Sequence, residues 1–224
     1  MLKAKVKVKI CGITNFADAR CACDAGAHFL GFNFYSRSPR YIDPKRARSI
    51  VRRLPKTVAS VGIFVNESEQ AMVRIAQLVG LKYVQLHGDE TPDLVSRLRR
   101  ALGAVKIIKA IRVQRAASVR RAARFDGASA ILLDGFDARQ RGGTGKSFDW
   151  SLAARASVKQ HIFLAGGLTP SNVAEAIRIV RPYAIDVCSG VESSPGKKNH
   201  GEIRVLMSNV NGTKRSRKKA SSRR

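Results

Sequence analysis

Short apolar runs alternate with amphipathic stretches along most of the chain. Between residues 5 and 210, each run rich in β-branched residues is followed by a loop and then by apolar positions spaced three or four apart. The short runs are typical of buried strands, and the wider spacing is typical of helices that bury one face. The predicted strands cover 6–10, 28–34, 57–65, 82–86, 105–111, 129–134, 161–165 and 183–188. The predicted helices cover 15–25, 44–53, 68–79, 91–101, 115–123, 149–156, 170–179 and 200–210.

Helix start signals support three of these helices. Each signal is a polar residue that can cap a helix, followed by a proline suited to the first turn. The pairs are Asp43-Pro44, Thr91-Pro92 and Thr169-Pro170.

Eight strand–helix units fill about 205 residues and leave no room for a second domain. Such alternation predicts a parallel sheet of the α/β class, either open and doubly wound or closed into a barrel. No Gly-x-Gly-x-x-Gly run is present for a dinucleotide site. We therefore expect residues 1–211 to form one (β/α)8 TIM barrel with eight parallel strands.

Composition limits the class of protein. With 44% hydrophobic and 26% charged residues, the chain has an ordinary globular composition. No apolar run approaches the roughly 18 residues of a membrane span, and the N-terminus does not resemble a signal peptide. Four cysteines without a secretion signal indicate reduced thiols in the cytoplasm. Cys21-x-Cys23 lacks a second pair at zinc-site spacing, so we expect core packing and no metal.

Charge is the unusual feature, because 42 Lys and Arg against 16 Asp and Glu give a net charge of +26. Residues 214–224 hold seven of the cations and no acid, and we expect 212–224 to be a disordered basic tail. Nonspecific contact of this tail with nucleic acid is conceivable but is not expected to be functional. A nucleic-acid-binding protein is the alternative from a different class, although only 6% aromatic residues argues against a platform for stacking bases.

Candidate chemistry lies at the predicted strand ends, since active sites of such barrels form at the C-terminal ends of the strands. A thiol, an arginine, a histidine and two carboxylates fall there, namely Cys11, Arg40, His87, Asp134 and Asp186. Any one of them alone is more often structural. Their concentration at one rim predicts an active site.

Glycines follow the last two strands. Loops after strands 7 and 8 of such barrels often bind phosphate through backbone N–H groups, which requires close backbone approach. Gly166 and Gly167 occupy the first of these loops, and Ser189 and Gly190 occupy the second. We expect a phosphate site there.

Cys11 and Asp134 form the candidate base and acid. A free thiol ionises near pH 8.5, so a thiolate at neutral pH needs help. Residues two apart on a strand share a face, so Lys9 points the same way as Cys11 and would favour the thiolate. A buried Lys9 would itself need a carboxylate partner, and Asp186 is the candidate. The competing interpretation is a packed, inert Cys11.

Many of these residues lie in stretches that resemble phosphoribosylanthranilate isomerase of tryptophan biosynthesis. The stretches run in family order from residue 9 to about 206. They are KICGITN (9–15), GFNFYSRSPRY (31–41), VGIFVN (61–66), VQLHGDE (84–90), LLD (132–134), GGTGKSFDW (142–150), LAGGL (164–168) and DVCSGVESSPG (186–196). Asn33 stands where an apolar residue is usual, Cys188 replaces a common serine, and the tail has no counterpart.

The resemblance implies an Amadori rearrangement of N-(5-phospho-β-D-ribosyl)anthranilate, without cofactor or metal. By the same resemblance, Asp134 is the acid and Cys11 the base, and these need opposite protonation at one pH. Arg40 would face the anthranilate carboxylate, and His87 and Asp186 would line the sugar. Gly166, Gly167, Ser189 and Gly190 would hold the phosphate. A positive rim would also steer this anionic, phosphosugar substrate.

Two further alternatives stay open. The isomerase of histidine biosynthesis is a related phosphate-binding barrel, but it uses aspartates as both acid and base, unlike Cys11. A catalytically dead barrel that serves as a scaffold is the other. The sequence does not predict the oligomeric state.

Overall fold

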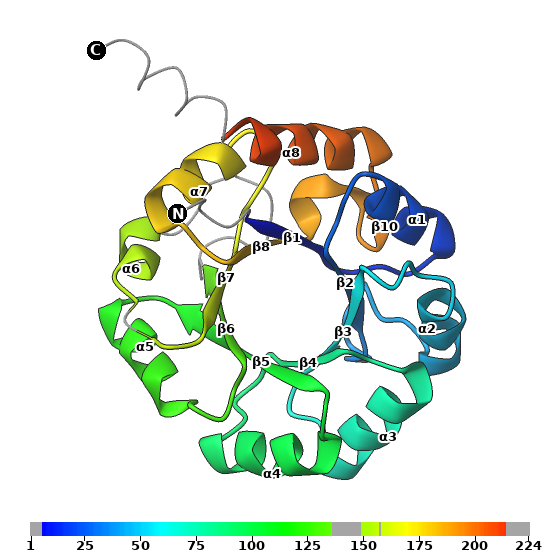
Figure 1. The fold of residues 1–224 in the computed structure, drawn as a ribbon, viewed down its shortest axis with the longest axis vertical. Helices are drawn as coiled ribbons and strands as arrows, with labels where there is room; N and C mark the ends of the chain where they lie inside the picture. Colours follow the sequence, from blue (N-terminus) through cyan, green and yellow to red (C-terminus); the bar gives the residue numbers. More distant parts are fainter. Residues whose placement is uncertain (1–5, 136–148, 157, 214–224) are drawn as a thin grey trace.

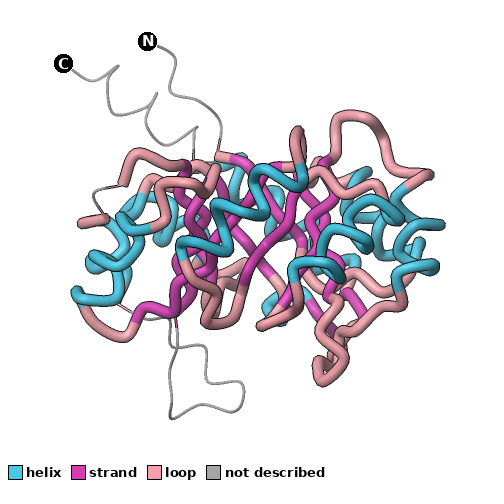
Figure 2. The backbone as a smooth tube through the Cα atoms, turned by 90° about the horizontal axis from the view of Figure 1, so that it is seen from below, coloured by secondary structure: helices cyan, strands magenta, loops and turns pink. Residues whose placement is uncertain are grey.

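The protein folds into a closed barrel of eight parallel strands surrounded by helices (Figure 1). A computed structural model describes residues 6–135, 149–156 and 158–213. Strands β1 to β8 pair in chain order, and β8 pairs back with β1 through Lys9–Asp186 and its neighbours in register. The predicted (β/α)8 architecture is confirmed. Seen from the side, the strands stand at the centre and the helices flank them (Figure 2).

The elements follow the predicted order. The barrel strands are β1 Lys7–Ile10, β2 Phe29–Asn33, β3 Ala59–Phe64, β4 Tyr83–Leu86, β5 Lys106–Val113, β6 Ala130–Gly135, β7 His161–Ala165 and β8 Ala184–Val187. The helices are α1 Phe16–Asp24, α2 Pro44–Val51, α3 Glu69–Val79, α4 Pro92–Leu102, α5 Ala116–Arg121, α6 Trp150–Ala154, α7 Val173–Val180 and α8 His200–Gly212. Two 3₁₀ turns, η1 Ala122–Arg124 and η2 Ser189–Val191, accompany them.

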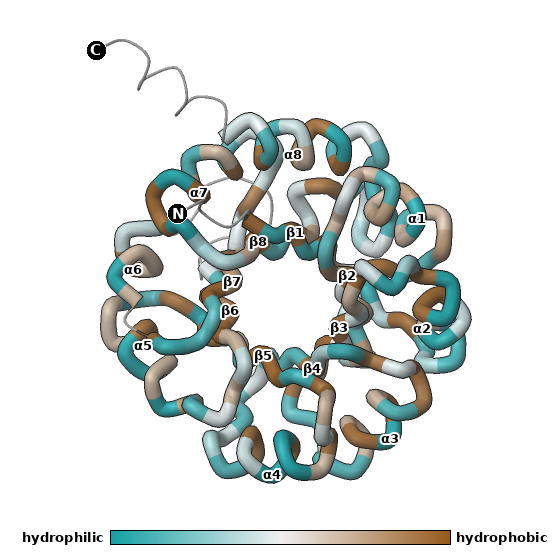
Figure 3. The backbone as a smooth tube through the Cα atoms, viewed as in Figure 1, coloured by the Kyte–Doolittle hydropathy of each residue, from teal (hydrophilic) through white to brown (hydrophobic). Residues whose placement is uncertain are grey.

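Apolar side chains fill two separate layers because successive strand residues point to opposite faces of the sheet. Ile108 of β5 and Leu132 of β6 belong to a cluster inside the barrel, whereas Ile107 and Ile131 pack outward in the cluster beneath the helices. Hydropathy alternates around the helices of the outer ring, as expected for helices that cover a core (Figure 3). This packing makes the barrel a solid support for the residues at its rim.

Two local features differ from the sequence-based expectation. Thr169 was expected to cap a helix that begins at 170, but α7 begins at Val173 with Asn172 as its N-terminal neighbour. Asn172 instead accepts from the Thr169 backbone N–H at 2.9 Å and donates to the Gly167 carbonyl at 2.8 Å, which holds a turn ahead of the helix. The hairpin of β9 Glu192–Ser194 and β10 Lys197–Lys198 was not predicted.

Helix α8 ends at Gly212, and the predicted basic tail lies outside the described residues from 214 onward. Within the described part of the chain, no helix is long and apolar enough to cross a membrane.

We expect Leu98→Ala to lower the free energy of unfolding by about 2–5 kcal/mol, because it opens a cavity under α4. Leu98 is fully buried against the barrel wall. Arg100→Ala on the exposed side of the same helix is the matched control and should change stability by less than about 0.5 kcal/mol. Urea denaturation measures both values. Equal effects of the two substitutions would contradict the packing described for α4.

Candidate active site

Cys11 lies directly after β1, at the C-terminal end of the barrel. Its backbone N–H donates to the Val187 carbonyl at 2.9 Å, which extends the β1–β8 ladder and sets Cys11 beside Cys188. On the other side, a Cβ atom on Gly31 would come within 2.8 Å of the Cys11 sulfur. Glycine at position 31 of β2 therefore leaves the room that the thiol occupies.

A buried ion pair lies one step below Cys11 on the same strand face. Lys9 Nζ lies 2.9 Å from both carboxylate oxygens of Asp186 on β8, and the two side chains are 0% and 7% exposed. The predicted pairing is thus present. Burial alone would lower the pKa of Lys9, but the charges of Asp186 and Cys11 raise it above its ordinary value. Lys9 is therefore a permanent cation beneath the thiol.

The surroundings favour a thiolate at Cys11. Hydrogen bonding with the Cys188 thiol lowers the pKa of Cys11 well below its ordinary value; burial opposes this, and the positive charges of Lys9 and Lys198 reinforce it. The same contact, together with burial, raises the pKa of Cys188. These surroundings favour a reactive thiol over an inert one, and the base role of Cys11 stays a prediction.

Asp134 and His87 face each other on another part of the same rim. Asp134 lies near the end of β6, and His87 follows β4, where its backbone N–H donates to Phe64 at 2.8 Å. His87 Nε2 is 3.1 Å from Asp134 Oδ2, and both side chains are about a quarter exposed, at 23% and 28%. Both residues are thus accessible from the barrel mouth.

Asp186 stands between the candidate base and the candidate acid. Burial raises its pKa to about 7; Lys9 opposes this, and the negative charges of Cys11 and Asp134 add to it. The strand of Asp186, β8, lies between β1, which Cys11 follows, and β7, and Asp134 lies on β6 next to β7.

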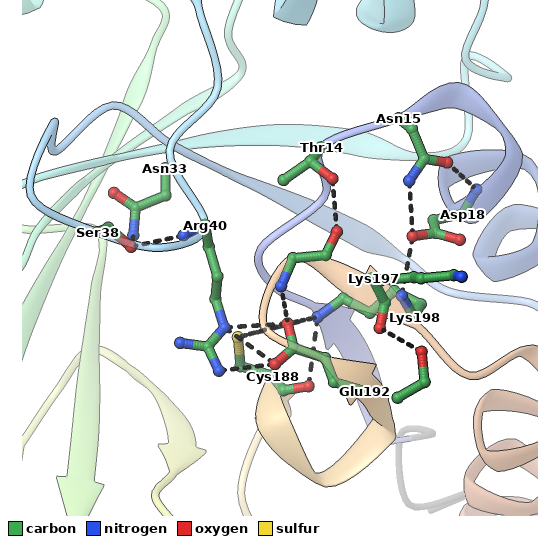
Figure 4. A network of polar contacts seen from close by, with 12 residues as sticks. Thr14, Asn15, Asp18, Asn33, Ser38, Arg40, Cys188, Glu192, Lys197 and Lys198 are labelled. Carbon is green, nitrogen blue, oxygen red and sulfur yellow. Dashed lines mark hydrogen bonds and ion pairs between the residues drawn. The ribbon is translucent and has the colours of Figure 1, made fainter. Parts of the chain in front are cut away.

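Arg40 is held by a carboxylate of the protein itself. Its Nε lies 3.0 Å from both oxygens of Glu192, and its Nη2 lies 2.6 Å from Oε2 (Figure 4). The third guanidinium nitrogen points away from Glu192 (Figure 4). Lys198 Nζ, fully buried, donates to Glu192 Oε1 at 2.8 Å. Arg40 was predicted to meet a substrate carboxylate, and that role stays a prediction.

The loop that carries Arg40 is shaped by Asn33, the residue that departs from the family pattern. Asn33 Oδ1 accepts from the Tyr35 backbone N–H at 2.9 Å, and its Nδ2 donates to Ser38 Oγ at 3.0 Å. Ser38 Oγ in turn accepts from the Arg40 backbone N–H at 3.1 Å. The polar side chain of Asn33 thus holds the loop in a turn, and through Ser38 it fixes the position of the Arg40 backbone.

The two glycine-bearing loops lie against each other. Gly166 and Gly167 have φ of 90° and 63°, in the region that favours glycine. A Cβ atom on Gly166 would overlap the backbone of Gly135, and one on Gly190 would overlap the Leu168 carbonyl oxygen. Ser189 begins the 3₁₀ turn η2 at this place. The predicted phosphate residues are therefore brought together, while phosphate binding itself stays a prediction.

Sequence reasoning missed four polar residues of the site, one of which is Glu192, the partner of Arg40. Gln85 Nε2 lies 3.0 Å from His87 Nδ1, Lys198 neighbours Cys188 and Glu192, and Cys188 contacts Cys11. Only Cys188 carried a signal, as a departure from the usual serine. Among the described residues, no group of three or more His, Cys, Asp or Glu side chains is arranged to hold a metal ion.

Comparison with known proteins agrees with this geometry. The family model described as "N-(5'phosphoribosyl)anthranilate (PRA) isomerase" matches residues 8–209. The N-(5'-phosphoribosyl)anthranilate isomerase of Trichlorobacter lovleyi is 48% identical over 206 residues, which cover 92% of this chain and 98% of that protein.

Two solved structures are similar over the same span. The phosphoribosyl anthranilate isomerase of Thermotoga maritima has a TM-score of 0.85 and 44% identity, covering 92% of this chain and 99% of that chain. A phosphoribosyl anthranilate isomerase in complex with reduced 1-(o-carboxyphenylamino)-1-deoxyribulose 5-phosphate has a TM-score of 0.81 and 41% identity, with the same coverage. This chain belongs to the N-(5'-phosphoribosyl)anthranilate isomerase family of tryptophan biosynthesis.

Proposed function

We propose that the chain converts N-(5-phospho-β-D-ribosyl)anthranilate into 1-(2-carboxyphenylamino)-1-deoxy-D-ribulose 5-phosphate, with Cys11 as general base and Asp134 as general acid. The observation that carries this assignment is the pair of cysteines above the Lys9–Asp186 ion pair, which favours a thiolate on the rim that also bears Asp134. A relative in complex with a reduced, phosphorylated carboxyphenylamino-deoxyribulose supports a phosphosugar ligand.

The steps need only proton transfers. Asp134 gives a proton to the furanose ring oxygen, the bond from that oxygen to C1′ breaks, and the anthranilate nitrogen lone pair forms the C1′=N bond of a Schiff base. The Cys11 thiolate then removes the proton from C2′, and the electrons of that C–H bond pass through C1′ to the iminium nitrogen. The resulting enolamine takes a proton at C1′ as its C2′ hydroxyl releases one, which gives the ketone. These two transfers return Cys11 to the thiolate and Asp134 to the protonated acid.

The binding groups follow the distribution of charge on the substrate. Backbone N–H groups at Gly166, Gly167, Ser189 and Gly190 would take the phosphate, because their loops follow β7 and β8 and lie against each other. The nitrogen of Arg40 that points away from Glu192 is the one available for the anthranilate carboxylate (Figure 4). His87 and Asp186 would line the sugar between them.

The cellular setting follows from the cysteines. All four, Cys11, Cys21, Cys23 and Cys188, are free thiols, and a thiolate base requires that they stay reduced. We propose a cytoplasmic location on this ground. No cofactor enters the proposed steps.

Freshly prepared substrate should lose its anthranilate fluorescence when mixed with the wild-type protein, and Cys11→Ala or Asp134→Asn should slow this turnover. Each substitution removes one proton-transfer group, so we expect kcat to fall at least about 10²-fold with little change in KM. Cys21→Ala, which removes a thiol from α1, is the matched control and should leave kcat unchanged. Near-complete activity of either site variant would refute the role given to that residue.

Cys188→Ala should move the acidic limb of the kcat/KM profile to higher pH. The base works as the thiolate, so activity rises with pH through the pKa of Cys11, and loss of the Cys188 hydrogen bond raises that pKa. Cys188→Ser retains a hydrogen-bond donor, so it should move the acidic limb less than Cys188→Ala does. A profile of Cys188→Ala that superimposes on the wild type would show that Cys188 does not set the ionisation of Cys11.

Arg40→Ala should chiefly raise KM, by about tenfold or more, because it removes a charged contact to the anthranilate carboxylate. Arg37→Ala, an exposed arginine on the same loop, is the control and should leave KM unchanged. Steady-state kinetics on both variants measure KM. An unchanged KM for Arg40→Ala would remove Arg40 from the substrate site.

A further inference from the structure

Gln85 is a buried polar side chain that the steps above do not use. It belongs to β4 and is only 1% exposed, with Ile63 and Ile108 as its neighbours in register. Residues two apart on a strand share a face, so Gln85 points into the barrel below His87. Its Nε2 lies 3.0 Å from His87 Nδ1.

The orientation of the Gln85 amide decides where His87 carries its proton. With Nε2 toward the ring, the amide donates to a lone pair on Nδ1, and Oε1 is left buried without a hydrogen-bond partner among the described residues. The reversed amide would leave an NH2 group with two donors at that same buried position. One unpaired acceptor costs less than two unpaired donors, which favours the orientation seen here.

An accepting Nδ1 places the proton of a neutral His87 on Nε2. That atom lies 3.1 Å from Asp134 Oδ2, so His87 donates to this oxygen. A protonated Asp134 must then carry its own proton on Oδ1. In the opposite tautomer, Nε2 would accept a hydrogen bond from a protonated Oδ2. The acidic proton of Asp134 would then point toward His87 and not toward the substrate.

We propose that Gln85 is a positioning residue for the general acid. By holding His87 in the Nε2–H form, Gln85 keeps the acidic proton of Asp134 on Oδ1. The same Nε2–H group stabilises the carboxylate that remains after Asp134 has protonated the ring oxygen. This proposal rests on the acid role of Asp134 in the proposed function.

The charged groups that share a cavity with His87 belong to the loop after β4, to β5 and to α5. A cavity of about 180 Å³ is lined by His87 together with Asp89, Glu90, Lys109, Arg112 and Arg121. Lys109 is itself bound to Glu90 at 2.8 Å. Gln85 and Asp134 are the groups that hydrogen-bond the ring directly, and they set its tautomer.

Two-bond ¹H–¹⁵N spectra of histidine-labelled protein report the tautomer without any turnover. The chain has four histidines, and the signal of His87 is identified by its loss in His87→Asn. At a pH where the ring is neutral, we expect the Nε2–H form in the wild type and loss of its dominance in Gln85→Met. An Nδ1–H form in the wild type would overturn the proposal, even if no Gln85 variant folds.

Kinetics on the same variants distinguish a positioning role of Gln85 from a purely structural role in the barrel. Gln85→Met should lower kcat about tenfold or more with KM within about twofold, and Gln85→Glu, which accepts from Nδ1–H, should lower it further. Gln160→Met is the matched control, because it also removes a part-buried hydrogen bond of a side-chain amide, to the Phe125 carbonyl, but at the N-terminal end of β7 and so away from the barrel mouth. Its tautomer spectrum and kcat should match the wild type.

An unchanged His87 tautomer together with an unchanged kcat in Gln85→Met would contradict the positioning role. Failure of the proposed function gives a different result. In that case Asp134→Asn keeps its turnover while the wild-type spectrum still shows the Nε2–H form.

Discussion

The site depends on one buried ion pair, between Lys9 on the first strand and Asp186 on the last. A lone ammonium inside the barrel would lose its hydration without compensation, and removing one partner of such a pair typically costs about 3–5 kcal/mol. Because Asp186 contacts Lys9 through both oxygens, the lysine stays charged in the interior. That fixed charge lies where the barrel closes, directly beneath Cys11.

Closure of the barrel and chemistry at its mouth therefore share the same residues. Strand β1 pairs with β8, so residues almost 180 positions apart in the sequence become neighbours, and Cys11 comes to lie beside Cys188. The thiol that ionises and the thiol that keeps its proton differ only in their surroundings. Cys11 receives the charges of Lys9 and the hydrogen bond of Cys188, as expected when a thiolate must persist at neutral pH.

Local sequence pattern was enough to predict the barrel and the Lys9–Asp186 pair at its core. Apolar runs located all eight strands, and the two-residue period put Lys9 and Cys11 on one face and suggested Asp186 as the partner. The Glu192 contact of Arg40 and the contribution of Lys198 were not predictable. Both form through the short hairpin after β8, whose polar residues show no period that separates a buried lysine from an exposed one. The Thr169 cap did not form, because the Thr169 hydroxyl pairs with Ser171 Oγ at 2.8 Å and the Thr169 backbone N–H donates to Asn172.

Direct titration of the Cys11 thiol tests the central claim most closely. The ultraviolet absorbance of the thiolate is measured against pH for both proteins, and the curve of Cys11→Ser is subtracted from that of the wild type to leave the contribution of Cys11. The account predicts a transition well below the ordinary range of a cysteine thiol, with Cys11 ionised at neutral pH. A transition at or above the ordinary range would show that Lys9 and Cys188 do not create a thiolate, and Cys11 would then not be the base.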